Sequence, residues 1–119
     1  MRRYPVIAAI AWVTVTAGSV LAHASLDHAE PKVGSAVESP AEVKIWFTDD
    51  ADLRGTTIEV LDASGKQVDK KDLHGDPKAK SIVVVSLLPK LPAGKYKVIW
   101  HARCPQGHKT KGEFSFEVK

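Results

Sequence analysis

Polar and apolar residues alternate in several short runs along the chain. The clearest runs are Val43/Ile45/Phe47, Ile58/Val60, Tyr96/Val98/Trp100 and Phe114/Phe116/Val118. A period of two residues predicts strands that bury one face. The β-branched run 83–85 is continuous instead, which is typical of a strand covered on both sides or of a central sandwich strand.

Segments rich in Pro, Gly, Ser and Asp separate these runs and are expected to form turns. They are 31–34, 39–40, 63–66, 74–77, 89–94 and 105–107. No amphipathic helical window is evident. We therefore expect seven strands near 24–29, 43–47, 57–62, 66–69, 81–87, 95–103 and 112–118. This is the pattern of an all-β, immunoglobulin-like or Greek-key β-sandwich.

The first 22 residues have the pattern of a secretory signal peptide. Arg2 and Arg3 precede an uncharged stretch that ends at Ala22, and its apolar part is shorter than the roughly 20 residues of a membrane span. We expect cleavage after Ala22, which leaves a mature domain, 23–119, that begins at His23 and has no membrane span. Cleavage after Ala24 is the alternative and would delete His23. An uncleaved anchor is a further alternative.

Composition narrows the class of protein. The chain has 119 residues, of which 44% are hydrophobic and 26% charged, as expected of one small domain. Without Arg2 and Arg3, 15 basic residues face 14 acidic ones, so nothing indicates a nucleic-acid partner. Cys104 is the only cysteine, so an intramolecular disulfide is impossible and stability must come from an apolar core.

Two histidines far apart in sequence are the candidate chemistry. A mature N-terminal His23 offers its α-amine and a ring nitrogen to one metal ion, and His108 adds a third nitrogen. Nitrogen donors in a tetragonal arrangement select copper(II). If every connection reverses direction, the first and last strands start at the same end, so His23 lies near the loop 104–111. The alternative is that the two histidines are unrelated surface groups.

The chain also resembles the CopC family of copper-resistance proteins from His23 to Val118. The opening 23–26, with Pro31 and Gly34, resembles the family's His-Ala-x-Leu start, and 43–47 matches its second apolar strand. Residues 92–100, Gly107-His108, Gly112 and 114–118 are similar to its Pro-x-Gly-x-Tyr-x-Val-x-Trp, Asp-Gly-His, Gly and closing-strand signature.

The resemblance implies a periplasmic, monomeric copper-binding protein that is not an enzyme. It implies Cu(2+) as the bound ion, His23 and His108 as ligands, and an inner-membrane copper transporter of the CopD type as a partner. The family's third ligand, the aspartate of Asp-Gly-His, is Gln106 here. Because a neutral amide is a weaker ligand than a carboxylate, water, Asp27 or Glu113 are alternatives.

Other residues near the loop have competing interpretations. Cys104 is either a thiolate ligand or a small buried residue. A methionine-rich copper(I) site, found in some relatives, is excluded because Met1 is the only methionine. Three basic residues surround His108 and either repel a cation or receive an acidic partner: Arg103, Lys109 and Lys111.

The remaining histidines and acids are expected to be structural. His101 should face away from Trp100, His28 shares the parity of Leu26 and should line the sandwich edge, and His74 and the acidic segment 49–52 should be solvated. Two other functions stay open. One is a metal-free immunoglobulin-like interaction module in which Gln106 records a lost copper site. The other is a copper oxidase, for which no acid/base pair or nucleophile is evident.

Overall fold

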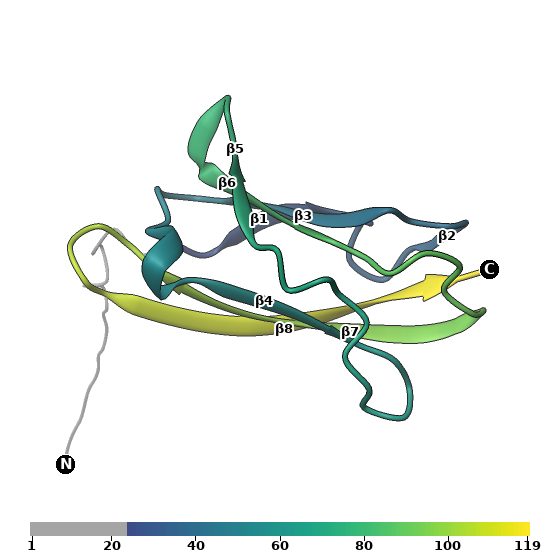
Figure 1. Cartoon of the computed structure of the whole chain (residues 1–119). Helices are drawn as coiled ribbons and strands as arrows, with labels where there is room; N and C mark the ends of the chain where they lie inside the picture. Colours follow the sequence, from purple (N-terminus) through teal and green to yellow (C-terminus); the bar gives the residue numbers. More distant parts are fainter. Residues whose placement is uncertain (1–23) are drawn as a thin grey trace, which may run out of the picture.

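The protein forms a β-sandwich of two four-stranded sheets (Figure 1). The computed structural model describes residues 24–119. The first sheet has the order β1 (Leu26–Glu30), β3 (Glu42–Phe47), β6 (Ala79–Ser86) and β5 (His74–Asp76). The second has the order β2 (Ala36–Val37), β8 (Lys109–Val118), β7 (Gly94–Arg103) and β4 (Thr57–Leu61). A 3-10 turn, η2 (Leu53–Gly55), follows β3. The prediction of an all-β sandwich is confirmed.

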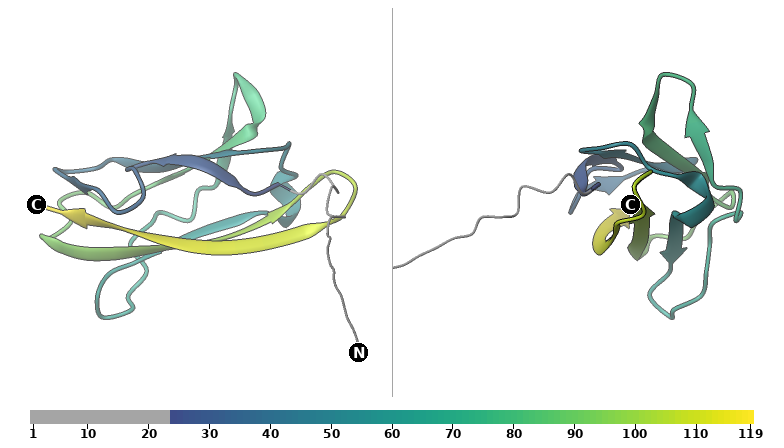
Figure 2. Two further views of the ribbon diagram at one scale, coloured as in Figure 1. Left: turned by 180° about the vertical axis from the view of Figure 1, so that it is seen from behind. Right: turned by 90° about the vertical axis from the view of Figure 1, so that its left-hand side faces the viewer.

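The core lies between the two sheets, which stack face to face in Figure 2. The alternating residues predicted to face inward are all buried. One ring pair joins the two sheets, since Phe47 of β3 meets Trp100 of β7 edge to face at 5.2 Å; within the second sheet, Tyr96 stacks on its ladder partner Phe116 at 5.5 Å. Tyr96 Oη also donates a 2.6 Å hydrogen bond to the Pro92 carbonyl, the tyrosine-corner arrangement of immunoglobulin-like domains.

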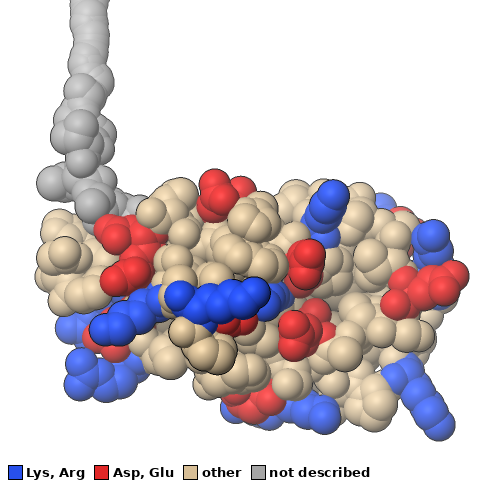
Figure 3. Space-filling view, turned by 90° about the horizontal axis from the view of Figure 1, so that it is seen from above, with Lys and Arg blue, Asp and Glu red and all other residues tan. Residues whose placement is uncertain are grey.

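The valine run occupies β6, in the middle of its sheet. Val83 and Val85 face the core, and Val84 is buried on the other side. Across the outer face of this sheet, positive and negative side chains are interspersed, as Figure 3 shows. On this sheet, Lys44 Nζ lies 2.9 Å from Asp76 Oδ2. Of the two interpretations of the valine run, the central sandwich strand is confirmed.

Three sequence predictions of local structure were wrong. Residues 66–69 make only isolated bridges, Leu61 to Gln67 and Asp69 to Leu87, and form no strand. The buried Asp69 carboxylate accepts hydrogen bonds from the amides of Val60 and Lys71, so a side chain takes bonds that a ladder would otherwise make. Residues 74–76, expected in a turn, form β5, and the two-residue β2 was missed.

Candidate metal site at the β7–β8 loop

His108 is presented by a tight hairpin loop between β7 and β8. The Gly107 amide donates to the Cys104 carbonyl at 2.8 Å, and the Cys104 amide donates to the His108 carbonyl at 2.9 Å. Only residues 105–107 lie between these partners. Gly107 has a φ of 95°, a left-handed backbone conformation that residues other than glycine adopt only at an energetic cost. Gly107 therefore permits the turn that presents His108.

The N-terminal end of the described chain is attached to the same hairpin. Thr110, two residues after His108, donates its hydroxyl to the Ala24 carbonyl. On the other side, the Ser25 amide donates to Thr48 Oγ1 at 3.1 Å, and the Thr48 amide donates to the Ser25 carbonyl at 2.8 Å. His23 itself lies outside the described residues. For Ala24 and Thr110, the prediction that the first and last strands start at one end is confirmed.

The strand register also brings a carboxylate to this end of the sandwich. Phe47 faces the core and Thr48 pairs with Ser25, so Asp49 falls on the inner-facing parity just beyond the strand. Asp49 is half-buried, and its Oδ1 accepts a 2.8 Å hydrogen bond from the Asp50 amide. Sequence reasoning placed 49–52 in a solvated turn; extending the alternation of β3 by two residues would have singled out Asp49.

The other carboxylates considered as ligands lie on outer faces. Asp27 sits at a bulge in β1, and its Oδ2 is 2.7 Å from His28 Nδ1. Glu113 Oε2 is 3.8 Å from Lys97 Nζ, on the outer side of β8. In the region 24–119, no group of three or more His, Cys, Asp or Glu side chains that could hold a metal is assembled.

The two remaining loop candidates differ in exposure. Gln106 is exposed at the tip of the loop, so its side-chain amide is accessible to a metal ion. Cys104 is 1% exposed and packs inside the hairpin. The interpretation of Cys104 as a small buried residue is therefore confirmed.

The other histidines lie elsewhere. His101 faces away from buried Trp100, as expected, and exposed His74 donates from Nδ1 to the Asp72 carbonyl at 2.8 Å. His28 does not share the orientation of Leu26, because the bulge between them shifts the register. Instead, His28 stacks on Trp46 on the outer face, with ring centroids 4.3 Å apart.

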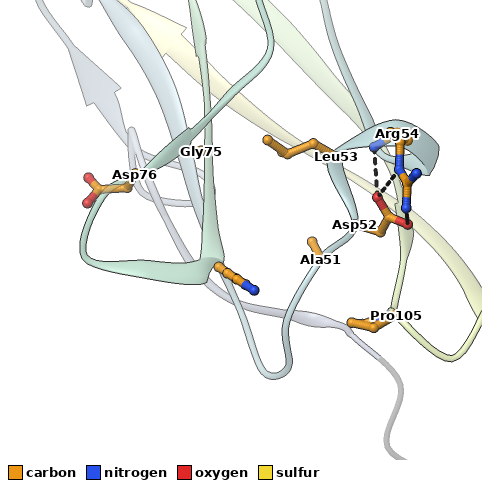
Figure 4. A pocket seen from close by; sticks show the side chains of 8 residues that line it. Ala51, Asp52, Leu53, Arg54, Gly75, Asp76 and Pro105 are labelled. Carbon is orange, nitrogen blue, oxygen red and sulfur yellow. Dashed lines mark hydrogen bonds and ion pairs between the residues drawn. The ribbon is translucent and has the colours of Figure 1, made fainter.

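An open groove of about 520 Å³ lies beside the loop, between η2 and the β5–β6 hairpin (Figure 4). Pro105 of the loop lines it together with Ala51, Asp52, Leu53, Arg54, Gly75, Asp76 and Lys80. Both acids of the groove are already engaged. The Arg54 amide and guanidinium hold the pKa of Asp52 below its usual value, and the Lys78 amide and Lys44 ammonium do the same for the pKa of Asp76.

These features define a class: a small two-sheet β-sandwich whose first strand starts beside a histidine-bearing hairpin. The family model described as "CopC domain" matches residues 26–119, and the chain therefore belongs to the CopC family. Between residues 24 and 119, no helix is long and apolar enough to cross a membrane.

Curated relatives cover most of the chain. Copper resistance protein C of Escherichia coli is 31% identical over 110 residues, covering 85% of each chain. Copper resistance protein C of Pseudomonas syringae pv. tomato is 30% identical over 105 residues, covering 82% of each. Protein YobA of Escherichia coli K12 is 27% identical over 112 residues, 93% of this chain and 90% of the relative.

Two solved structures share the fold. CopC from Methylosinus trichosporium OB3b has a TM-score of 0.74 and 28% identity, covering 82% of this chain and 94% of its own. PcoC from Escherichia coli, described as a methionine-rich copper resistance protein, has a TM-score of 0.72 and 26% identity, covering 82% of this chain and all of its own (100%).

Proposed function

We propose that this chain is a periplasmic copper(II)-binding protein of copper resistance, which sequesters or passes on the ion without chemical turnover. One observation carries the proposal: the Thr110 hydroxyl holds the Ala24 carbonyl two residues from His108. The residue directly before Ala24 is His23. Two relatives are both named copper resistance protein C, which supports copper as the bound ion.

The proposed ligands are the α-amine and ring nitrogen of His23, the ring of His108 and a carboxylate of Asp49. Asp49 would compensate for Gln106, which replaces the aspartate of the family motif. The charge matters, because two unit charges at about 4 Å attract by roughly 4 kcal/mol at an effective dielectric of about 20. Asp27 and Glu113 are less suitable substitutes, since each is already beside a basic group on an outer face.

The oxidation state follows from the donor set. Nitrogen and carboxylate donors suit copper(II), whereas copper(I) favours thioether and thiolate sulfur. Met1 is the only methionine and belongs to the expected signal peptide 1–22, and Cys104 is buried. The expected mature chain, 23–119, therefore contains no methionine, the residue that the description of PcoC emphasises.

Copper(II) titration of four forms of the exported protein, monitored by calorimetry and electron paramagnetic resonance, tests the ligand set. The forms are the chain from His23, the chain from Ser25, His108→Ala and Asp49→Asn. We expect the chain from Ser25 to lose two nitrogen donors and His108→Ala to lose one, each with a clear change in the copper(II) signal and weaker binding. Asp49→Asn should weaken binding about 10- to 1,000-fold, because up to roughly 4 kcal/mol of attraction is lost. His101→Ala is the matched control and should bind as the parent does.

Equal, weak copper uptake by all of these forms would contradict the proposal and favour a metal-free interaction module. Intact-mass measurement of the exported protein completes the test, because it shows whether the mature chain starts at His23 or Ser25. The CopD-type transporter remains the partner that the family resemblance implies, and its copper uptake from the loaded protein would be measured separately.

A further inference from the structure

We propose that the outer face of the β2–β8–β7–β4 sheet, at its loop end, docks an acidic segment of a partner protein. Four residues form this basic strip, in two directly paired rows: Arg103 opposite Lys109, and His101 opposite Lys111. Arg103 and Lys109 are both basic, and like charges placed directly opposite one another destabilise a sheet. The stability of the folded sheet therefore does not account for this arrangement of basic side chains.

The far end of the same two strands shows the opposite arrangement. Lys95 lies directly opposite Glu117, and Lys97 Nζ is 3.8 Å from Glu113 Oε2. Both lysines at that end therefore have an acidic neighbour across the strand pair. The contrast within one hairpin separates the basic strip from an ordinary solvated face.

The nearest acids do not neutralise the strip. Glu59 and Glu113 flank Ile99, one outward-facing row beyond His101 and Lys111. Asp52 lies near Arg103: its amide donates to the Arg103 carbonyl at 2.6 Å, and, beside the hydrogen bonds from Arg54, the Arg103 charge contributes to the lowered pKa of Asp52. Its carboxylate, however, accepts from the Arg54 amide at 3.0 Å and from Arg54 Nε at 3.3 Å, and so brings a further cation with it.

The 3-10 turn η2 lies between the strip and the groove of Figure 4, since it lines the groove and also contacts Arg103. Gly55 packs directly against the Arg103 side chain, where an added Cβ would lie 2.4 Å from Cδ. Arg54 and Lys80 line the groove, its two acids are engaged by basic groups, and Leu53 is 41% exposed. A chain segment with several carboxylates and one apolar side chain fits this combination.

A protein segment suits the surface better than an anionic membrane. The strip is narrow, because the acidic row of Glu59 and Glu113 borders it along the strands. A flat bilayer would bring this acidic border against its own negative charge. A single extended chain can follow the strip and avoid it.

The test uses the mature protein without copper and a labelled synthetic peptide of 12 residues, with alternate Glu and one central Leu. Binding is followed by fluorescence anisotropy and by amide shifts in ¹⁵N spectra. Exposed ion pairs contribute up to about fivefold each, so Lys109→Gln/Lys111→Gln should weaken peptide binding about fivefold or more. The matched control, Lys95→Gln/Lys97→Gln, should change it by less than about twofold. Raising the salt concentration should weaken binding.

The amide shifts of the parent should map to residues 53–54 and 101–111. Equal loss in both double variants, or no binding by the parent, would overturn the proposal. Binding to phosphatidylglycerol vesicles in preference to the peptide would also overturn it, in favour of a membrane surface. Because no copper is present, these outcomes are independent of the metal site, and neither variant removes a proposed copper ligand.

Discussion

Gly112 is the position where one added methyl group should most disturb the hairpin that carries His108. It pairs with Trp100 across the β7–β8 ladder, and an added Cβ would lie 2.6 Å from Trp100 Cζ2 and 2.8 Å from Cε2. These separations are far inside van der Waals contact, and the 5%-exposed indole is also wedged against Phe47. The ring therefore cannot move away without opening the core.

The expected cost of Gly112→Ala follows from overpacking. Forcing extra volume into a packed core costs about 1 to 3 kcal/mol, against which the alanine recovers about 0.4 to 1 kcal/mol of unfolded-chain entropy. The net loss is about 1 to 2 kcal/mol. For a domain of this size, that lowers the melting temperature by about 5 to 15 °C. Thermal unfolding, followed by circular dichroism in the near and far ultraviolet, measures it.

Gly75→Ala is the matched control. An added Cβ at Gly75, in β5, would meet Leu53 Cδ1 at 3.6 Å, which is ordinary contact, and no positive φ is involved. Its melting temperature should stay within about 3 °C of the parent or rise slightly. If Gly112→Ala melts together with Gly75→Ala, the close approach of Gly112 and Trp100 does not limit the packing and the reasoning is wrong.

Three further predictions concern buried and paired groups. Asp69→Ala should lower the free energy of unfolding in urea by about 1 to 3 kcal/mol, because the buried Val60 amide loses its acceptor; an unchanged midpoint would contradict this. Cys104 should react with a thiol reagent only in denaturant, and fast labelling of the native protein would show that it is accessible. Acid should destabilise the fold below pH 3.8, the usual aspartate pKa, because hydrogen bonds hold the pKa values of four carboxyl groups below this value. The stabilisation from these hydrogen bonds is complete above that pH and disappears as the pH falls through the pKa values of the folded state. Urea unfolding between pH 2 and 6 measures the effect, and stability independent of pH would refute it; the donors are Arg54 for Asp52, Ser64 for Asp62, Ser86 for Asp72 and Lys78 for Asp76.

The long strands were predictable because burial decides them. Each of β3, β4, β7 and β8 buries alternate residues, and hydrophobic alternation records this directly in the sequence. The strands β2 and β5 were missed for the opposite reason. They have two and three residues and pair at sheet edges, so the partner strand determines them and their own residues do not. The Asp69 carboxylate disrupted the predicted strand at 66–69 in the same non-local way.

The candidate site was predictable only in part. Gly107-His108 after a long alternating strand indicated a hairpin that presents a histidine, and the structure has that hairpin. Asp49 was missed because the alternation of β3 was not extended beyond Phe47, and the pairing of Ser25 with Thr48 supports that extension. The bulge at Asp27, which moves His28 to the outer face, depends on the register between β1 and β3, and no local pattern records it.

The attachment of Ala24 makes the position of signal cleavage a structural matter as well as a chemical one. Cleavage after Ala22 retains His23 and leaves the Ala24 carbonyl on the Thr110 hydroxyl. Cleavage after Ala24 would remove the proposed metal chelate and that carbonyl together, along with a residue that is 1% exposed. The hairpin would then lose its contact with the N-terminal segment just where copper(II) is proposed to bind. A chain cut after Ala24 should therefore be less stable even without copper. A chain that keeps His23 but has a blocked α-amine should lose only copper(II) affinity and keep its stability.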